Sequence, residues 1–565
     1  MRRDFTRRDF LKLIVFGVSA VGLPTLFYLA WLDEQENRWA NSYNSTRVPT
    51  RTSTLTSTQP PTNSPTNTSS PTDTPTPTDT PEPTSTLTTI DWYVDSKNGN
   101  DSNTGTAPNQ AFATLAKVQE VLREGQTVGL ARMSHWHEQL TISQNNIKVV
   151  AYGSGEKPIL DCSDDLDNTN FTKTPGYQNV YEINISPDLG RSKTWMRAWE
   201  NDKGLLYAPS IAECNTMPGS YYPSSNIGSS PITLYIHASD SSDVRSNGKV
   251  YAASMRKYGI DAYFAENILI DGIETRRNLG EDGSLRLGRF GRLENCVCRD
   301  GSKHNLYVRT GTVIKKVEAV DAYYAGNPAS LFIYNDDSPN SEGVTFERCI
   351  ARCTKRDART TGFYGHRNVS GDFGLLKYDH CQAINCNLGF QGNHATEVQL
   401  TDLIVKDCTF SIRTGGTMLT GTGLRVTGPC SMVVGITSGE PKVRLSRINT
   451  QVDCENTLIV YTKSGGDITI SDSIFQGTSF IGANRIFYIE NAKTSLQLTR
   501  NVYGDGFAHV YYMPQVGSLT SDNNCFESEK SSFKLNGFDF AMVSDWQRST
   551  NQDINSRIGS CLSLP

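Results

Sequence analysis

A six-residue pattern that recurs between residues 270 and 503 constrains the fold of this chain more than any other feature. Each copy has an apolar residue, then two polar residues, and then a small or apolar residue that we call the anchor. The spacing between anchors varies from 21 to 40 residues. Such spacing is typical of a β-solenoid, in which insertions enter the loops while the inward positions stay aligned. The anchors are Ile273, Cys296, Val317, Cys349, Cys381, Cys408, Ile448, Ser473 and Asn501.

A second set of strand-like segments accompanies the five anchors in the middle of this series. The segments cover 305–309, 330–334, 362–366, 389–393 and 417–421. In each of them, the residue predicted to point inward follows its anchor by 9 to 14 residues. Two ladders with a common offset favour a solenoid over a sandwich of unrelated strands. The predicted inward residues are Leu306, Leu331, Phe363, Phe390 and Met418.

The composition of the 565-residue chain also favours many short strands and turns. Hydrophobic residues make up 37% and charged residues 20%, and there are 46 glycines. Such a chain does not suit a helical bundle or a coiled coil. The formal net charge of −5 gives no electrostatic reason to expect a nucleic-acid partner. We therefore expect an all-β protein that does not bind nucleic acid.

The N-terminal segment is predicted to serve export. Residues 6–12 read TRRDFLK and resemble the twin-arginine export motif. The uncharged run at 13–32 is long enough to cross a ~30 Å hydrocarbon core as a helix. Residues 1–35 are therefore predicted to be a twin-arginine signal, or an ordinary signal that anchors the chain in the membrane if uncleaved. Both alternatives place the remainder outside a bacterial cytoplasmic membrane.

The next segment, residues 36–89, is predicted to be a disordered linker. Between residues 51 and 90 there are 16 threonines, 8 prolines and no aromatic residue. A segment of this kind cannot bury enough apolar surface to offset its chain entropy, and its prolines keep it extended. We expect it to hold the folded part away from the membrane or the cell wall.

The 13 cysteines are an odd number for an exported protein. Several of them are anchors of the repeat, and twin-arginine export carries proteins that have already folded in a reducing cytoplasm. We therefore predict that most cysteines are small buried apolar residues, with a disulfide framework as the alternative.

The ladders, together with residues 92–118 and 151–160, resemble the pectate-lyase-like right-handed parallel β-helix proteins. The segment at 92–118 is similar to the opening strand and short capping helix of that superfamily, and residues 544–556 resemble a closing segment of its secreted members. The resemblance implies a right-handed parallel β-helix over residues 90–565, with irregular early coils or an insertion at 161–260. It also implies a structural role for Glu138. The superfamily includes lyases, hydrolases, epimerases and sugar-binding proteins, so the resemblance does not specify the reaction.

The residues that alternate with the inward positions are predicted to form an exposed strip that binds a polysaccharide. Stacked coils lie ~4.8 Å apart, so five strands give a strip about 20 Å long. Aromatic faces stack on sugar rings, whereas amide and guanidinium groups hold hydroxyl and carboxylate groups. The alternative is that surface aromatics only cover the sheet. The candidate substrate-binding residues are Tyr307, Phe332, Tyr364, Gln391, Asn393 and His304.

The strip has basic residues but no carboxylate, which favours elimination over hydrolysis. β-Elimination from a uronate needs a base for the proton beside the carboxylate, and positive charge for the enolate-like intermediate. The catalytic candidates are Arg309, His366, Arg367, His394 and Tyr334, with Tyr364 as an alternative proton donor.

Hydrolysis and metal binding would both need acidic residues outside the strip. Glycoside hydrolysis normally needs two carboxyl groups. The nearest carboxylates are in loops, and the segment at 161–260 adds two more that could reach the strip from above. Asp336 and Asp337 are also the candidate ligands for Ca²⁺. The carboxylates in question are Asp336, Asp337, Asp357, Asp372, Glu200 and Asp202.

We predict a monomeric, exported cell-surface enzyme of the polysaccharide lyase type that acts on an acidic glycan. Two alternatives stay open: a non-catalytic β-solenoid that binds glycan or has a structural role, and a glycoside hydrolase. The partner is a polysaccharide in each case, and the membrane is a further partner if the N-terminal segment is retained. No motif for nucleotide binding, serine esterase chemistry or a zincin site supports another reaction class.

Overall fold

The computed structural model describes most of the chain from residue 89 to residue 561. The described part excludes 189–195, 225–230, 281, 324–328, 337–341, 357–358, 368–372, 393–394, 437–438, 454–457 and 478–483. The predicted signal or anchor at 1–35 and nearly all of the linker at 36–89 lie outside it. Across the described residues, no helix has both the length and the apolar character needed to cross a membrane.

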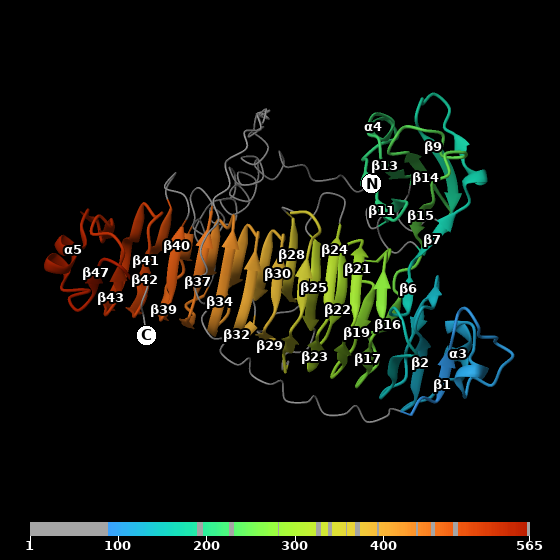
Figure 1. The fold of residues 1–565 in the computed structure, drawn as a ribbon, viewed down its shortest axis with the longest axis horizontal. Helices are drawn as coiled ribbons and strands as arrows, with labels where there is room; N and C mark the ends of the chain where they lie inside the picture. Colours follow the sequence, from blue (N-terminus) through green and yellow to red (C-terminus); the bar gives the residue numbers. More distant parts are fainter. Residues whose placement is uncertain are drawn as a thin grey trace, which may run out of the picture. The chain divides into compact units, whose positions relative to one another are not determined.

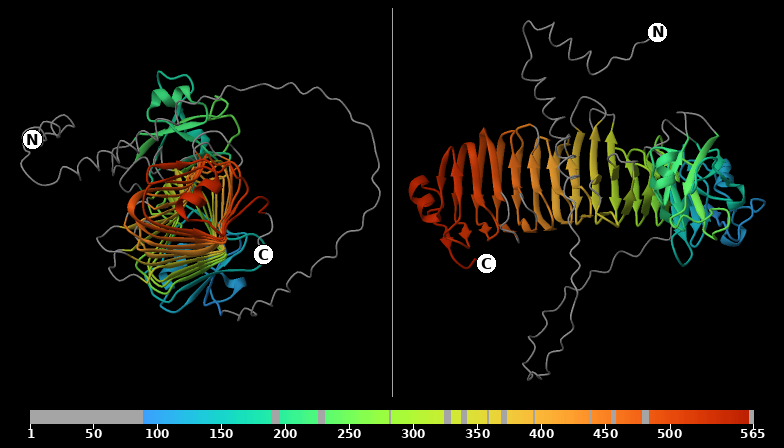
Figure 2. Two further views of the ribbon diagram at one scale, coloured as in Figure 1. Left: turned by 90° about the vertical axis from the view of Figure 1, so that its left-hand side faces the viewer. Right: turned by 90° about the horizontal axis from the view of Figure 1, so that it is seen from above.

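The described strands wind into a parallel β-helix, which confirms the predicted all-β solenoid (Figure 1). Its coils form one continuous sheet of 38 strands with three ladders, which we call sheets 1, 2 and 3. Figure 2 (left) views the stacked coils end on. Sheet 1 contains β4 (Leu140–Thr141), β16 (Ile260–Ala262), β19 (Leu285–Leu287), β22 (His304–Val308), β25 (Ala329–Asp336), β28 (Thr360–Arg367), β31 (Leu388–Gly392), β33 (Phe410–Thr414), β35 (Met432–Ile436), β38 (Leu458–Thr462), β41 (Arg485–Thr499), β43 (His509–Asp522), β45 (Phe533–Leu535) and its hairpin partner β46 (Phe538–Phe540).

Sheets 2 and 3 complete each coil, and several long strands bend from one sheet into the next. Sheet 2 contains β1 (Trp92–Val94), β2 (Thr127–Ala131), β5 (Lys148–Tyr152), β17 (Leu269–Asp271), β20 (Arg292–Glu294), β23 (Thr312–Lys315), β26 (Val344–Glu347), β29 (Phe373–Asp379), β32 (Ala395–Lys406), β34 (Met418–Gly428), β36 (Lys442–Ser446), β39 (Gly466–Ser471) and the second halves of β41 and β43. Sheet 3 contains β3 (His135–Trp136), β6 (Ile159–Asp161), β18 (Glu274–Arg276), β21 (Val297–Gly301), β24 (Glu318–Ala322), β27 (Ile350–Arg352), β30 (Gln382–Ile384), the second halves of β32 and β34, β37 (Asn449–Val452), β40 (Ile474–Gly477), β42 (Val502–Tyr503), β44 (Cys525–Phe526) and β47 (Arg557–Ile558).

A left-handed residue precedes each anchor and turns the chain from sheet 2 to sheet 3. The φ angles of these residues lie between 48° and 78°. This left-handed conformation is uncommon for residues other than glycine and marks a sharp turn of the backbone. Apart from the two glycines and the half-buried Lys316, these residues are exposed, whereas the anchors that follow are buried. The same turn thus repeats in every coil and keeps the anchors stacked. The turn residues are Gly272, Asn295, Lys316, Arg348, His380, Asp402, Gly423, Arg447, Asp472, Arg500 and Asn523.

The structure corrects one predicted anchor and adds two. Cys381 is followed in its ladder by Leu403, not by Cys408, because His380 donates its backbone N–H to Thr401 and Gln382 pairs with Ile404. Leu424 is the next anchor, and it lies beside Leu403 in the register. Cys408 instead stacks on Cys386, which lies after the sheet 3 strand of its coil, not at the anchor position before it. The apparent 40-residue gap before Ile448 therefore contains a complete coil whose anchor is an ordinary leucine.

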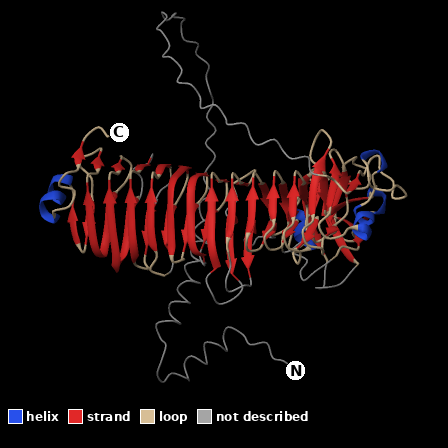
Figure 3. Ribbon diagram, turned by 90° about the horizontal axis from the view of Figure 1, so that it is seen from below, coloured by secondary structure: helices blue, strands red, loops and turns tan. Residues whose placement is uncertain are grey.

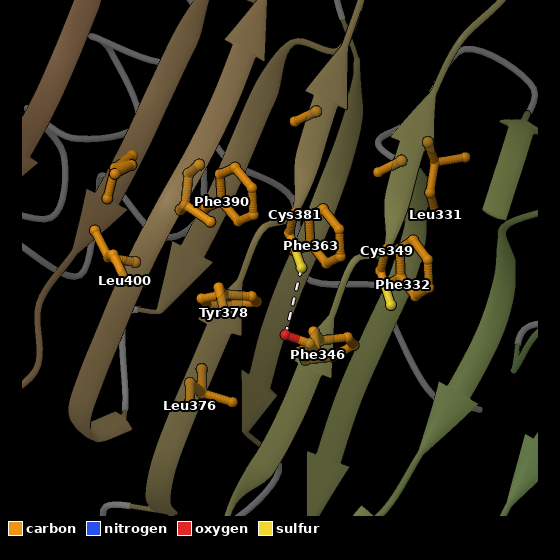
Figure 4. Packing of buried hydrophobic residues seen from close by; sticks show 14 of the residues in the cluster. Leu331, Phe332, Phe346, Cys349, Phe363, Leu376, Tyr378, Cys381, Phe390 and Leu400 are labelled. Carbon is orange, nitrogen blue, oxygen red and sulfur yellow. Dashed lines mark hydrogen bonds between the residues drawn. The ribbon is translucent and has the colours of Figure 1, made fainter. Parts of the chain in front are cut away.

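The solenoid interior is filled by stacked side chains of like type (Figure 4). Phe332, Phe363 and Phe390 stack with ring centroids 4.6 and 4.7 Å apart, and all three are buried. The Cys381 thiol lies 3.4 Å from the carbonyl oxygen of Phe346, so the cysteine anchor also satisfies a weak hydrogen bond. Because each side chain packs on its counterpart in the next coil, the core extends along the whole solenoid.

Polar anchors near the C-terminal end are satisfied by hydrogen bonds between coils. The Ser473 hydroxyl accepts the N–H of Ile448 at 3.0 Å. The Asn501 and Asn524 side chains accept the N–H groups of Ser473 and Asn501 at 3.1 and 2.9 Å. A buried polar ladder of this kind avoids the cost of unpaired donors and acceptors.

Helices close the two ends of the solenoid (Figure 3). α3 (Leu115–Val121) covers the first coil, and the Glu138 carboxylate accepts the N–H groups of Leu115 and Ala116 at 2.9 and 3.1 Å. Glu138 thus holds the start of the capping helix, as the resemblance implied. α5 (Val543–Thr550) covers the last coil through Trp546, whose ring stacks on Phe533 at 5.0 Å. A short 3₁₀ turn, η1 (Pro108–Gln110), precedes α3.

The cysteines are mostly buried thiols, as predicted. One disulfide, Cys525–Cys561, joins the last coil to the C-terminal segment. Cys454 lies outside the described residues. The free and buried cysteines are Cys162, Cys214, Cys296, Cys298, Cys349, Cys353, Cys381, Cys386, Cys408 and Cys430.

An insertion between β6 and β16 builds a second small core beside the first coils (Figure 1). It contains a four-stranded and a five-stranded sheet, which pack around buried residues such as Tyr221 and Leu234. Its elements are β7 (Ser163–Leu166), η2 (Asn168–Asn170), β8 (Thr172–Lys173), β9 (Tyr181–Ile185), β10 (Ala198–Glu200), β11 (Lys203–Gly204), β12 (Leu206–Tyr207), α4 (Ile211–Thr216), β13 (Ser220–Pro223), β14 (Ile232–His237) and β15 (Tyr251–Ser254).

Candidate functional site

One line of outward positions runs along sheet 1 from the first coils to the last. We call it the outer row. Its members are adjacent in the strand register, so their side chains lie about 4.8 Å apart along the solenoid axis. The outer row consists of Thr141, Asp261, Arg286, Tyr307, Ile333, Tyr364, Gln391, Arg413, Gly435, Tyr461, Tyr488, Tyr512 and Lys534.

The predicted outward orientation of Phe332 and Tyr334 is wrong. Phe332 pairs with Leu306 and Phe363, and its exposed fraction is 0%; that of Tyr334 is 1%. Ile333 takes the outward position instead. The strand is apolar on both faces, so alternation along its sequence could not distinguish inside from outside. Leu331, predicted to point inward, is buried but lies one position away from the stacked aromatic ladder.

The predicted inward position of Met418 is also wrong. Met418 is half-buried and belongs to β34 in sheet 2, where Leu419 is the buried residue. The strand that continues the ladder is β33, in which Ile412 points inward and Arg413 outward. Sequence analysis therefore missed Arg413.

The remaining candidates have different positions. Tyr307 and Gln391 lie in the outer row, but Tyr307 is buried, so its predicted exposure is wrong. His304 is buried near the start of its strand. His366, Arg367 and Asp336 lie in described strands, but their side chains are outside the described part. Asn393, His394 and Asp337 are outside it altogether, and so are Asp357 and Asp372.

An aromatic and arginine cluster surrounds the start of the outer row. The Tyr263 ring lies 4.9 Å from the Arg286 guanidinium, 4.8 Å from the Arg309 guanidinium and 5.7 Å from the Tyr307 ring. Next to it, Phe264 is 82% exposed. An exposed aromatic ring beside arginines can stack on a sugar face while the guanidinium groups pair with an anion. Arg286 itself is neutralised, because it contacts Asp261 at 2.7 Å and Asp282 at 3.0 Å.

Arg309 and Arg413 have no acidic partner among the residues that the structure describes. Both are half-buried, and the Nε atom of each is shielded from solvent without a hydrogen-bond partner. The Nε atoms of the ion-paired Arg277 and Arg299 share this property, so the missing carboxylate is what distinguishes Arg309 and Arg413. A buried donor left unpaired costs free energy unless a ligand satisfies it. These two guanidinium groups are therefore suited to an anion that binds to the outer face.

Tyr364 lies in the outer row between the levels of these two arginines. Burial raises the pKa of Tyr364, and the nearby charge of Arg413 opposes that effect. Tyr364 is therefore protonated at neutral pH. His366 follows Tyr364 by two residues in the same strand.

A cluster of carboxylates and arginines lies where the insertion meets sheet 3. We call it the junction cluster, and it includes the insertion residues Arg197, Trp199 and Asp202. The Arg277 guanidinium contacts Asp202, and it lies 5.0 Å from the Trp199 ring. Arg197 lies 5.2 Å from the same ring and 3.9 Å from Asp300. The solenoid members of the cluster are Asp161, Glu274, Arg276, Arg277, Arg299 and Asp300.

The junction cluster holds carboxyl groups whose pKa values are shifted in opposite directions. Burial raises the pKa of Glu274 against the opposing charges of Arg299 and Arg276. Burial also raises the pKa of Asp300, although Arg197 opposes it. Burial acts in the same sense on Asp161, but His135, Arg276 and Arg277 hold its pKa well below the usual range. Carboxyl groups shifted apart in this way are a common feature of acid–base sites.

His135, His137 and Asp161 lie close enough to hold a metal ion, with ligand atoms within 4.8 Å of one another. However, the Asp161 Oδ2 atom that faces His135 also accepts a hydrogen bond from the Arg276 guanidinium at 2.6 Å. A cation would have to displace this arginine and approach Arg277 as well. The trio is thus better explained as an ion-pair network than as a metal site.

No protein-family model and no curated protein matches the sequence. Among solved structures, the chain is similar to that of XylC in complex with xylose, with a TM-score of 0.52 and 10% identity over 76% of this chain and 86% of that chain. It is also similar to a glycoside hydrolase (TM-score 0.43, 8% identity, 69% and 96% covered). A third similar structure is the GH136 lacto-N-biosidase from Eubacterium ramulus (0.29, 12%, 83% and 67%). The first likeness supports the fold alone, and the other two are too weak to support more.

Proposed function

We propose that this protein is an exported enzyme of the polysaccharide lyase type that binds an acidic glycan along the outer row. The observation that supports this most directly is the pair Arg309 and Arg413. Each is a half-buried cation without an acidic partner in the described part of the chain. A uronate carboxylate would supply that partner through charge-assisted hydrogen bonds. The exposed ring of Phe264 would contact a sugar face, whereas the outer-row residue Tyr307 is buried.

The same surface has groups that suit β-elimination. In that reaction a base removes the proton beside the carboxylate, a carbon–carbon double bond forms, and the bond to the glycosidic oxygen breaks. His366 is the proposed base, and Tyr364 is the proposed donor of a proton to the leaving oxygen. Arg309 would stabilise the negative charge that develops on the carboxylate. Tyr334 is buried and is no longer a candidate donor.

Glycoside hydrolysis in the junction cluster is a second candidate function. Glu274 and Asp300 have raised pKa values, so either could act as the general acid. Asp202 is 82% exposed, and its pKa is lowered, first by the hydrogen bond from Arg277, so it would supply an ionised carboxylate. An acid and an ionised carboxylate are the pair that hydrolysis requires.

The test is to incubate the full chain with polygalacturonate, alginate and xylan, with and without Ca²⁺. Xylan is included because XylC was solved with xylose. Ultraviolet absorbance reports unsaturated ends, and a reducing-sugar assay reports all cleavage. We expect absorbance that Arg309→Ala and His366→Ala abolish and that the control Arg425→Ala, an exposed arginine on sheet 3, leaves unchanged.

The other outcomes distinguish the alternatives. Reducing ends without absorbance, lost in Asp300→Asn, would replace the lyase with the hydrolase. No cleavage in either assay, with glycan still bound, would overturn both enzymes in favour of a binding module. Ca²⁺-dependent activity that Asp336→Asn shifts to higher Ca²⁺ concentrations would support the proposed metal ligands.

A further inference from the structure

The outer row has a second aromatic group near the C-terminal end of the solenoid. Tyr461, Tyr488 and Tyr512 follow one another in the register of β38, β41 and β43. Their ring centroids are 5.5 and 5.3 Å apart, and all three side chains are half-buried. We call this group, together with Arg485, the distal platform.

Arg485 is the charged centre of the distal platform. Its guanidinium lies 4.9 Å from the Tyr488 ring and 4.0 Å from the Tyr512 ring. Its Nε atom is shielded from solvent and has no hydrogen-bond partner, and no described carboxylate pairs with it. Arg485 therefore has the same features as Arg309 and Arg413.

The lysines beside the platform are paired, unlike Arg485. Lys463 contacts Glu490 at 3.0 Å, and Lys534 contacts Asp539 at 3.6 Å. Glu490 also accepts a hydrogen bond from the Tyr488 hydroxyl, so a carboxylate borders the platform. Within the described part of the chain, Glu490 and Asp539 form their ion pairs with the lysines and not with Arg485. His509, whose ring lies 5.1 Å from that of Tyr512, has a pKa lowered by burial and then by Arg485, so it adds no charge at neutral pH.

Packing of the sheet does not require three consecutive tyrosines. The outer row has Ile333, Gln391 and Gly435 at equivalent positions, and the strands pair equally well there. Tyrosine pairs across strands do stabilise a sheet. That explanation does not account for an arginine that lies over two rings and lacks an acidic partner.

We propose that the distal platform is a separate binding site for an acidic polysaccharide, in which the tyrosine rings stack on sugars and Arg485 pairs with a carboxylate. In the outer row, Gly435 lies between Arg413 and Tyr461. A Cβ at this position would lie 2.5 Å from the Cε atom of Met432, so the row has no side chain between the two sites. Four strand spacings, about 19 Å, separate Tyr461 from Tyr364. The platform would therefore hold a polymer that extends beyond the proposed lyase site. The distal platform depends on the proposed function only for its class of ligand, an acidic polysaccharide.

The test measures binding of the full chain to polygalacturonate, alginate and xylan by affinity electrophoresis. Arg309→Ala is the common background, so that cleavage does not remove the ligand. We expect Arg485→Ala and Tyr512→Ala to weaken binding to an acidic polymer about tenfold, the loss of one charge-assisted hydrogen bond or one aromatic stack. Tyr512→Phe keeps the ring and should bind as the parent does. Arg425→Ala is the control for loss of one positive charge.

Specific results would overturn the platform. Unchanged binding in Arg485→Ala, or an equal loss in Arg425→Ala, would contradict a site at Arg485. Equal binding to xylan would contradict the acidic ligand class. Absorbance in the lyase assay with no effect of Arg485→Ala on binding would reject the platform and keep the lyase. Platform-dependent binding without absorbance would keep the platform and reject the lyase.

Discussion

The arginines of sheet 3 and those of the outer row differ in how they are neutralised. Between β18 and β27, each outward arginine of sheet 3 contacts a carboxylate of the preceding coil. The pairs are Arg276–Asp161, Arg299–Glu274 and Arg352–Glu318. On the outer face of sheet 1, the half-buried Arg309, Arg413 and Arg485 have no such partner in the described part of the chain.

This difference separates charges that hold coils together from charges available to a ligand. An ion pair between adjacent coils is complete within the protein, so it has little to offer an external anion. A shielded arginine without a partner gains most when an anion arrives. Under the proposed function, chemically similar side chains serve different roles on two sheets of one solenoid.

The largest expected effect is on stability, at the buried end of the sheet 3 pairs. Asp161 has an exposed fraction of 0% and contacts Arg276 and Arg277. Asp161→Asn should lower the free energy of unfolding by about 3 kcal/mol, because it leaves buried arginine charge uncompensated. Urea denaturation measures this. The control Asp472→Asn removes the partner of the exposed Arg500 and should cost less than about 1 kcal/mol. A similar loss in both variants would contradict a special role for the buried pair.

The next effect is on binding, in the outer row. Arg413→Ala should weaken affinity for an acidic polymer about tenfold while changing stability by less than about 1 kcal/mol. The affinity of the parent should fall with added salt more steeply than that of the variant. Titration calorimetry at two salt concentrations measures both quantities. If Arg413→Ala lost stability rather than affinity, the distinction between the two sheets would fail.

A smaller effect concerns the pH dependence of stability. The pKa of Asp300 is raised in the folded state, so ionisation of Asp300 costs stability as pH rises above its unfolded value, about 3.9. Asp300→Asn should therefore stabilise the protein at neutral pH, with no gain in acid. Asp161 has the opposite sign, because its lowered pKa contributes stability that is lost as pH falls. Thermal unfolding of Asp300→Asn and Asp161→Asn across pH measures both effects. Changes in stability of the same sign at neutral pH would contradict the opposite pKa shifts of the two residues.

The smallest effect is expected at a half-exposed pair of sheet 3. Glu318→Gln should cost about 0.2–1 kcal/mol by removing the partner of Arg352. It also creates an unpaired arginine on a face that has no aromatic platform. Binding to acidic polymers should not increase, as affinity electrophoresis would show. If Glu318→Gln increased the affinity for acidic polymers as much as Arg413→Ala decreases it, any unpaired arginine would be enough for binding.

The sequence predicted the coil repeat because cysteine and β-branched anchors stand out against polar neighbours. It failed at Leu403 and Leu424, where the anchor is leucine and the strand continues through the turn. It also reversed Phe332 and Tyr334, since their strand is apolar on both faces. Glu274 and Asp300 could not be identified, because burial raises their pKa values, and that burial depends on how segments distant in the sequence pack around them.

The left-handed turn before each anchor makes the coil a unit of length. Lys316 and Arg348 have nearly the same φ, 53° and 54°, and occupy the same place in successive coils. A deletion from one to the other would remove one coil and rejoin the chain at an equivalent residue. The two aromatic groups of the outer row would then keep their own geometry if the excised coil lay between them. Insertion or deletion of whole coils can therefore change the length of the outer row in steps of about 4.8 Å.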